Sequence, residues 1–160
     1  MLKANCCKKI LMVVLWVSIV STLAGAETFR FTVSADNRPL GGQNITRWEW
    51  LLDEMSMNVI DAGVFHIMPG DFDDPRYTDA SLIQQFGSDV VWYPVVGNHE
   101  AETPSDMEWI RDAFRGLPHI VKEGPAGSET TTYSWDYGNA HFVALNQYYD
   151  GVSDTGAGGD

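Results

Sequence analysis

The chain has 160 residues, of which 22 are acidic and 10 are basic, so its formal charge at neutral pH is −12. This excess of negative charge repels phosphates and therefore disfavours binding to a nucleic-acid backbone or to anionic lipid. The two cysteines, Cys6 and Cys7, lie near the N-terminus. The remainder of the chain therefore has no thiolate for a disulfide or a metal, and its stability must come from core packing.

The N-terminus has the three-part organisation of a secretory signal peptide, which we expect to span residues 1–26. Three lysines precede an apolar core at residues 10–24, and Ala24-Gly25-Ala26 fits a small-residue cleavage pattern. The core is short for a membrane span, which needs roughly 20 residues. We therefore expect export to the periplasm or the extracellular space without a stable membrane anchor, an uncleaved anchor being the alternative. The remainder would carry a charge of −15, from 7 basic and 22 acidic residues.

Three segments share one pattern, an apolar, β-branched or aromatic run that ends in an oxygen ligand suitable for a metal. Continuous apolar character is typical of strands buried on both faces, as in a parallel sheet covered by helices. We therefore predict three parallel strands. The segments are residues 28–36, 62–71 and 89–98, ending in Asp36, Asp71 and Asn98.

Helical patterns separate and follow these strands. In residues 45–55 apolar side chains recur every three or four positions, and residues 79–87 predict a shorter helix that ends at Gly87. After the third segment, residues 105–108 have the sequence of a capping box, and an apolar stripe continues through residues 107–114. The order βαβαβα is typical of an α/β sheet.

Residues 130–149 differ from the preceding pattern. They contain two strand-like runs joined at Gly138-Asn139, which predicts a β-hairpin. Aromatic residues alternate along the first run, and we interpret this as core and surface alternation rather than as a binding platform.

The strand ends predict a functional site. Ligands of a parallel α/β sheet bind beyond the carboxyl ends of the strands, so Asp36, Asp71 and Asn98 would meet at one edge. Carboxylate and amide oxygens suit hard or borderline divalent cations. Gly70 and Gly97 precede two of them and allow sharp turns. Each residue alone could be a turn or cap residue, but three at three strand ends favour a metal site.

Two motifs resemble those of the calcineurin-like metallophosphoesterases, a superfamily that includes the purple acid phosphatases. Residues 69–74, Pro-Gly-Asp-Phe-Asp-Asp, resemble its Gly-Asp-x-x-Asp motif, and residues 95–100, Val-Val-Gly-Asn-His-Glu, its Gly-Asn-His-Glu motif. Residues 133–146 resemble the hairpin that follows in exported members. The likeness covers nearly all of residues 28–150. It implies the N-terminal half of a four-layer α/β/β/α sandwich, as one domain spanning residues 27–160.

The resemblance also implies a dinuclear metal centre. Asp36 would bind a first metal ion, Asn98 a second one, and Asp71 would bridge the two. The metals would be Fe, Zn or Mn. Two such ions about 3.5–4 Å apart can hold a hydroxide and direct it at the phosphorus of a phosphate ester.

Other residues would support that centre. The resemblance implies that His99 stabilises the transition state or protonates the leaving oxygen, and that Asp74 and Glu100 orient the metal ligands. The usual first motif is Asp-x-His, but Arg38 stands at the place of the histidine. A guanidinium has no lone pair to donate to a metal, so we expect Arg38 to bind the substrate phosphate through its planar fork.

A second departure from the family concerns the missing imidazole ligands. The family completes its centre with one His and then a Gly-His-x-His pair after the hairpin, and this chain contains no such pair. His66, His119 and His141 lack that context. We expect packing or hydrogen-bonding roles for His66 and His141, and a solvated His119. The chain would then be the N-terminal half of a longer enzyme, a fragment or truncated product that is poorly active alone.

The sequence thus predicts a metal-dependent phosphoric ester hydrolase, with motif residues compatible with monoesters and with diesters. The alternative is an exported acidic relative of these enzymes that binds cations or a partner without catalysis.

Overall fold

The computed structural model describes residues 28–38, 44–59 and 63–156. Within these ranges the chain forms four helices and two three-stranded sheets, which confirms a mixed α/β fold. The predicted signal peptide lies outside the described residues. None of the described helices has the length and the apolar character that crossing a membrane requires.

The first sheet is parallel, as predicted. Its strands are β1 (Thr32–Val33), β2 (His66–Pro69) and β3 (Trp92–Val95), in the order β1-β2-β3. They are shorter than the apolar runs that contain them, because pairing stops where the backbone turns. After β2, for example, Gly70 has φ 81°, which glycine adopts without strain.

Helices follow the three strands of this sheet in the expected order. They are α1 (Asn44–Asn58), α2 (Pro75–Phe86), α3 (Asn98–Glu102) and α4 (Pro104–Ala113). The five-residue helix α3 was not predicted. It begins directly after β3, so the Gly-Asn-His-Glu segment forms the start of a helix instead of an open loop.

Two helices begin earlier than predicted, each with a proline in its first turn. Helix α2 starts at Pro75 because the side chain of Asp74 accepts a hydrogen bond from the backbone of the first turn at 2.9 Å. Helix α4 starts at Pro104, so the capping box predicted at Ser105 is wrong. The fixed φ of proline suits the first helical position, and it sets the start of both helices.

The helices cover one face of the first sheet. The predicted apolar stripes of α1 and α4 are buried there, together with one side of β2 and β3, and they form the larger core. This core includes Trp48, Leu52, Met55, Met68, Leu82, Trp92, Met107, Ile110 and Phe114.

The second sheet is antiparallel and consists of β4 (Ile120–Glu123), β5 (Tyr133–Tyr137) and β6 (Ala140–Ala144). The hairpin of β5 and β6 turns at Gly138, φ 57°, as predicted. Strand β4 was not predicted, because three of its four residues are exposed and it carries no buried apolar run.

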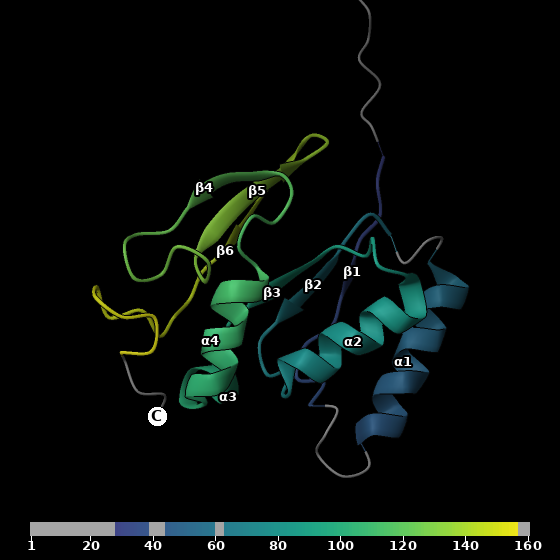
Figure 1. Ribbon diagram of the computed structural model, residues 1–160. Coiled ribbons are helices and arrows are strands. Elements are labelled where there is room, and N and C mark those ends of the chain that lie inside the picture. The colour runs from purple at the N-terminus through teal and green to yellow at the C-terminus, as the bar shows by residue number, and fades with distance from the viewer. Residues whose placement is uncertain (1–27, 39–43, 60–62, 157–160) are drawn as a thin grey trace, which may run out of the picture.

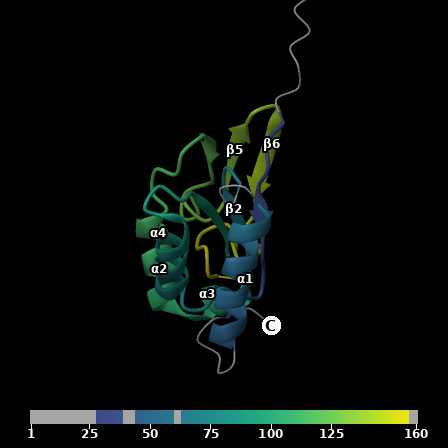
Figure 2. The same cartoon turned by 90° about the vertical axis from the view of Figure 1, so that its right-hand side faces the viewer.

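The second sheet packs on the face of the first sheet that the helices leave uncovered. Tyr93 of β3 stacks on Trp135 of β5, with ring centroids 4.1 Å apart, and Phe65 meets the edge of Trp135. The aromatic residues of β5 are therefore core residues. Figure 1 shows the hairpin of β5 and β6 above the helices, and Figure 2 shows the same arrangement after a 90° turn.

Candidate functional site

Hydrogen bonds join the segments that leave β1 and β2. The backbone nitrogen of Asp36 donates to the carbonyl of Gly70 at 3.1 Å, and that of Arg38 donates to the carbonyl of Asp71 at 3.3 Å. These hydrogen bonds hold the two segments side by side beyond the point where the strand pairing ends. It places Asp36 and Asp71 at the same edge of the sheet.

Glu100 joins the segments that leave β2 and β3. Its carboxylate is fully buried and accepts hydrogen bonds from the backbone nitrogens of Gly97 (2.9 Å), Asp71 (3.0 Å) and Phe72 (2.8 Å). Burial raises the pKa of Glu100 above its ordinary value, while the three backbone donors act in the opposite direction. Glu100 thus fixes the backbone that carries Asp71, which is compatible with the orienting role expected of it.

Gly97 allows the segments after β2 and β3 to approach each other closely. A Cβ at this position would overlap the carboxylate of Asp71 and would lie 2.5 Å from the Asp71 backbone nitrogen. The backbone nitrogen of His99 donates to Oδ1 of Asp71 at 3.5 Å. Asp71 and Asn98 line one cavity of about 310 Å³, and Asp36 is not among the residues that line it.

Three residues of this edge have left-handed backbones although none is glycine. They are Asp36 (φ 55°), Arg38 (φ 37°) and Asp71 (φ 55°), and among the described residues His119 is the other non-glycine case. Such conformations cost of order 1–3 kcal/mol each and cluster at functional sites. Their concentration at the ends of β1 and β2 favours a function for this edge.

Arg38, Asp73 and His99 form a polar cluster beside this edge. Arg38 Nε donates to Asp73 Oδ2 at 3.3 Å, Arg38 Nη2 lies 3.4 Å from His99 Nδ1, and His99 Nδ1 lies 3.7 Å from Asp73 Oδ2. The predicted substrate-binding arginine and the predicted catalytic histidine are therefore neighbours.

Sequence reasoning missed Asp73, although the acidic run 71–74 contains it. Its Oδ1 is buried and has no hydrogen-bond partner. Asp74, selected instead, caps α2 and pairs with Arg76 at 3.3 Å. An orienting role of Asp74 at a metal centre stays a prediction.

The other histidines have the surroundings expected of them. His66 is buried between Thr32 Oγ1, 2.6 Å from Nδ1, and Ser34 Oγ, 2.9 Å from Nε2, and burial lowers the pKa of His66 to about 4. His141 is exposed and pairs with Asp136 at 2.5 Å. His119 is also exposed.

The candidate ligands are of a type that binds metal ions, but they are too few for a complete metal centre. Asp36 and Asp71 offer carboxylates and Asn98 an amide oxygen, which are ligands for hard or borderline cations. In the part of the chain that the structure describes, no three His, Cys, Asp or Glu residues are grouped so that they could hold a metal ion. A complete centre therefore needs further ligands.

The segment after β6 also contributes to the cavity, which sequence reasoning missed. Leu145, Gln147 and Tyr148 line it opposite the edge of the first sheet. No motif marks these residues, because their place depends on long-range packing.

The chain matches no protein-family model, no curated protein and no solved structure at a significant level. What the site does is therefore inferred from its own residues and geometry.

Proposed function

We propose that the chain is part of an exported, metal-dependent phosphoric ester hydrolase, and that residues 27–160 form the N-terminal half of its four-layer domain. One observation carries the proposal: hydrogen bonds between the segments that leave β1, β2 and β3 bring Asp36, Asp71 and Asn98 to one edge, with Arg38 and His99 beside them. The stack of helices, parallel sheet and antiparallel sheet is compatible with three of the four layers.

Asp36, Asp71 and Asn98 would hold two ions of Fe, Zn or Mn, together with imidazoles that the remainder of the proposed enzyme would supply. The unpartnered, buried Oδ1 of Asp73 supports a cation nearby, because a buried oxygen without a hydrogen bond is costly unless something compensates it. Bound ions would supply Lewis-acid polarisation of a phosphoryl oxygen and a nucleophile from water at neutral pH.

Arg38 and His99 would act on the substrate itself. A guanidinium can only donate, so the 3.4 Å contact requires His99 Nδ1 to accept and leaves the proton on Nε2. Nε2–H is then the group that donates to a phosphate oxygen or to the leaving oxygen. The remaining N–H groups of Arg38 can bind phosphate oxygens as a planar fork.

Asp73 would hold Arg38 in place. Its Oδ2 accepts from Arg38 Nε at 3.3 Å and lies 3.7 Å from His99 Nδ1. This arrangement restrains Arg38 directly and His99 through the contact with Arg38, and it leaves the N–H of His99 Nε2 unused.

The test is metal binding and ester hydrolysis by the purified chain. Bound metal would be measured after dialysis against Mn, Zn or Fe, and hydrolysis with 4-nitrophenyl phosphate and bis(4-nitrophenyl) phosphate. We expect Asp71→Asn to lose metal and activity, and the exposed control Asp112→Asn to keep both. Metal binding with slow hydrolysis is expected of a chain that lacks the imidazole ligands. Metal binding with no hydrolysis above the metal-free blank would favour the non-catalytic relative, and loss of neither property in Asp71→Asn would refute the proposed site.

A further inference from the structure

The cavity beside Asp71 and Asn98 has two walls of different chemistry. One wall is the carboxyl edge of the first sheet, and the other is the segment after β6, with Leu145, Gln147 and Tyr148. Its volume of about 310 Å³ falls at the lower end of the range for small-molecule sites. The cavity can therefore take a ligand that is larger than a bare phosphate.

The wall after β6 combines the apolar side chains of Leu145 and Tyr148 with the amide of Gln147. Leu145 is 66% exposed, so its side chain is accessible to a ligand in the cavity. Tyr148 is almost buried, and its hydroxyl accepts a hydrogen bond from Gln147 Nε2 at 2.7 Å. The first sheet adds the apolar side chains of Val95 and Val96. The cavity thus passes from carboxylate and amide at one side to hydrocarbon at the other.

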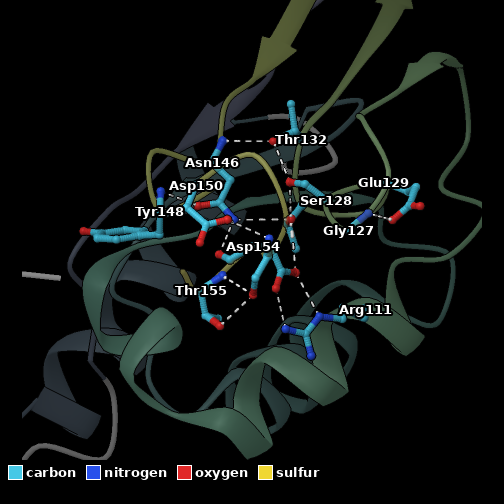
Figure 3. Close-up of polar contacts among 12 residues, drawn as sticks. Arg111, Gly127, Ser128, Glu129, Thr132, Asn146, Tyr148, Asp150, Asp154 and Thr155 are labelled. Atoms are coloured by element: carbon cyan, nitrogen blue, oxygen red, sulfur yellow. Dashed lines mark hydrogen bonds and ion pairs between the residues drawn. The ribbon is translucent and has the colours of Figure 1, made fainter. Parts of the chain in front are cut away.

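A buried ion pair holds this wall in place. Asp154 is 3% exposed and accepts from Arg111 of α4 through both carboxylate oxygens, at 2.8 and 2.5 Å. Asn146 donates to the carbonyl of Asp154 at 2.8 Å and accepts from the backbone nitrogen of Tyr148 at 2.9 Å. Figure 3 shows the ring of Tyr148 turned away from this network. The wall is therefore attached to α4 before any ligand binds.

We infer that Leu145 and Tyr148 form the subsite for the alcohol group of the ester and select apolar or aromatic alcohols. The inference rests on the proposed hydrolase function. A phosphate bound at Asp71 and Asn98 leaves the rest of the ester in the same cavity, against Leu145 and Tyr148. Gln147 donates to the Tyr148 hydroxyl and so fixes the ring, which belongs to the larger core and lines the cavity with the 9% of its surface that is exposed.

Non-hydrolysable phosphonates test the subsite without depending on turnover or on the leaving group. Binding of phenylphosphonate and of methylphosphonate would be measured by calorimetry on the full chain with Mn²⁺ supplied. The wild type should bind phenylphosphonate about tenfold more tightly, because the ring buries apolar area that a methyl group does not. Leu145→Ser should reduce the preference below about threefold and leave methylphosphonate binding unchanged.

Val143→Ser is the matched control, because Val143 is 57% exposed, lies two residues away and lines a different cavity. It should keep the full preference. Equal binding of the two phosphonates by the wild type, no binding of either, or an unchanged preference in Leu145→Ser would overturn the subsite. Failure of the hydrolase proposal is seen separately, as wild-type protein that neither retains metal nor cleaves an ester.

Discussion

Oε2 of Glu100 lies 3.0 Å from the backbone nitrogen of Asp71, 29 positions earlier in the chain. The same oxygen accepts from Gly97, and Oε1 accepts from Phe72. One buried carboxylate thus provides the acceptors for three backbone donors on two segments, and it determines where Asp71 stands relative to β3.

Replacing Glu100 should therefore destabilise the protein. Glu100→Ala leaves three buried N–H groups without an acceptor, and we expect a loss of about 3 kcal/mol in the free energy of unfolding, measured by urea titration. Glu100→Gln, which keeps one acceptor oxygen, should lose less. The exposed Glu108→Ala of α4 serves as the control, and a loss in Glu100→Ala no larger than in this control would contradict the role assigned to Glu100.

Gly97→Ala should weaken metal binding. The added Cβ overlaps the Asp71 carboxylate, so this side chain must leave its present position. We expect at least about tenfold weaker Mn²⁺ binding by calorimetry, and a loss of stability of about 1–3 kcal/mol from overpacking. Gly87→Ala is the control for the general effect of adding a Cβ to a glycine. Gly87 has φ 92° and open space around it, so an added Cβ strains the backbone there without overlapping a neighbour. It should cost stability without changing metal affinity, and equal metal affinity in both variants would refute the prediction.

Stability should depend on pH through His66. Burial holds the pKa of His66 at about 4, below its ordinary value of 6.5. Between these two pH values the unfolded chain binds a proton that the folded protein does not, so the contribution is complete above pH 6.5 and is lost as the pH falls towards 4. The loss amounts to about 3 kcal/mol.

The effect of His66 is measured as a difference, because the carboxylates also titrate in this range. The stability advantage of wild type over His66→Gln should shrink by about 3 kcal/mol between pH 7 and pH 4. A gap between wild type and His66→Gln that does not change with pH would count against a neutral, buried His66.

The ion pair of Arg111 and Asp154 should be worth much more than the pair of Arg115 and Asp112. Asp154 is buried, so Arg111→Met leaves an uncompensated charge and should cost about 3 kcal/mol in urea titrations. Both partners of the second pair are mostly exposed, and Arg115→Met should change stability by less than about 0.5 kcal/mol. Similar costs for the two variants would show that the segment after β6 is not fixed by Asp154.

The sequence was sufficient to predict the three parallel strands, for a physical reason. Parallel strands that are buried on both faces require unbroken apolar runs. Where two such strands end side by side, the backbone must turn sharply, and glycine followed by a short polar residue allows this turn. Gly70-Asp71 and Gly97-Asn98 carry that signal locally. The apolar stripes of α1 and α4 follow in the same way from helical periodicity.

What could not be predicted depends on contacts between distant segments or on weak local signals. Strand β4 is mostly exposed, so no apolar run marks it. Asp74, chosen as an orienting group, is engaged in capping α2, while its neighbour Asp73 meets Arg38, 35 positions earlier. Leu145 and Tyr148 reach the cavity because Asp154 is bonded to Arg111, 43 positions away, which no short motif encodes.

The left-handed backbone conformations of Asp36, Arg38 and Asp71 lower the thermal stability of the protein at the edge that carries the candidate site. Glycine at any of the three positions would relieve strain that an L side chain imposes. A library of variants selected for heat resistance alone should therefore enrich glycine or asparagine at these three positions. The enriched variants would lose the charged side chains of the candidate site.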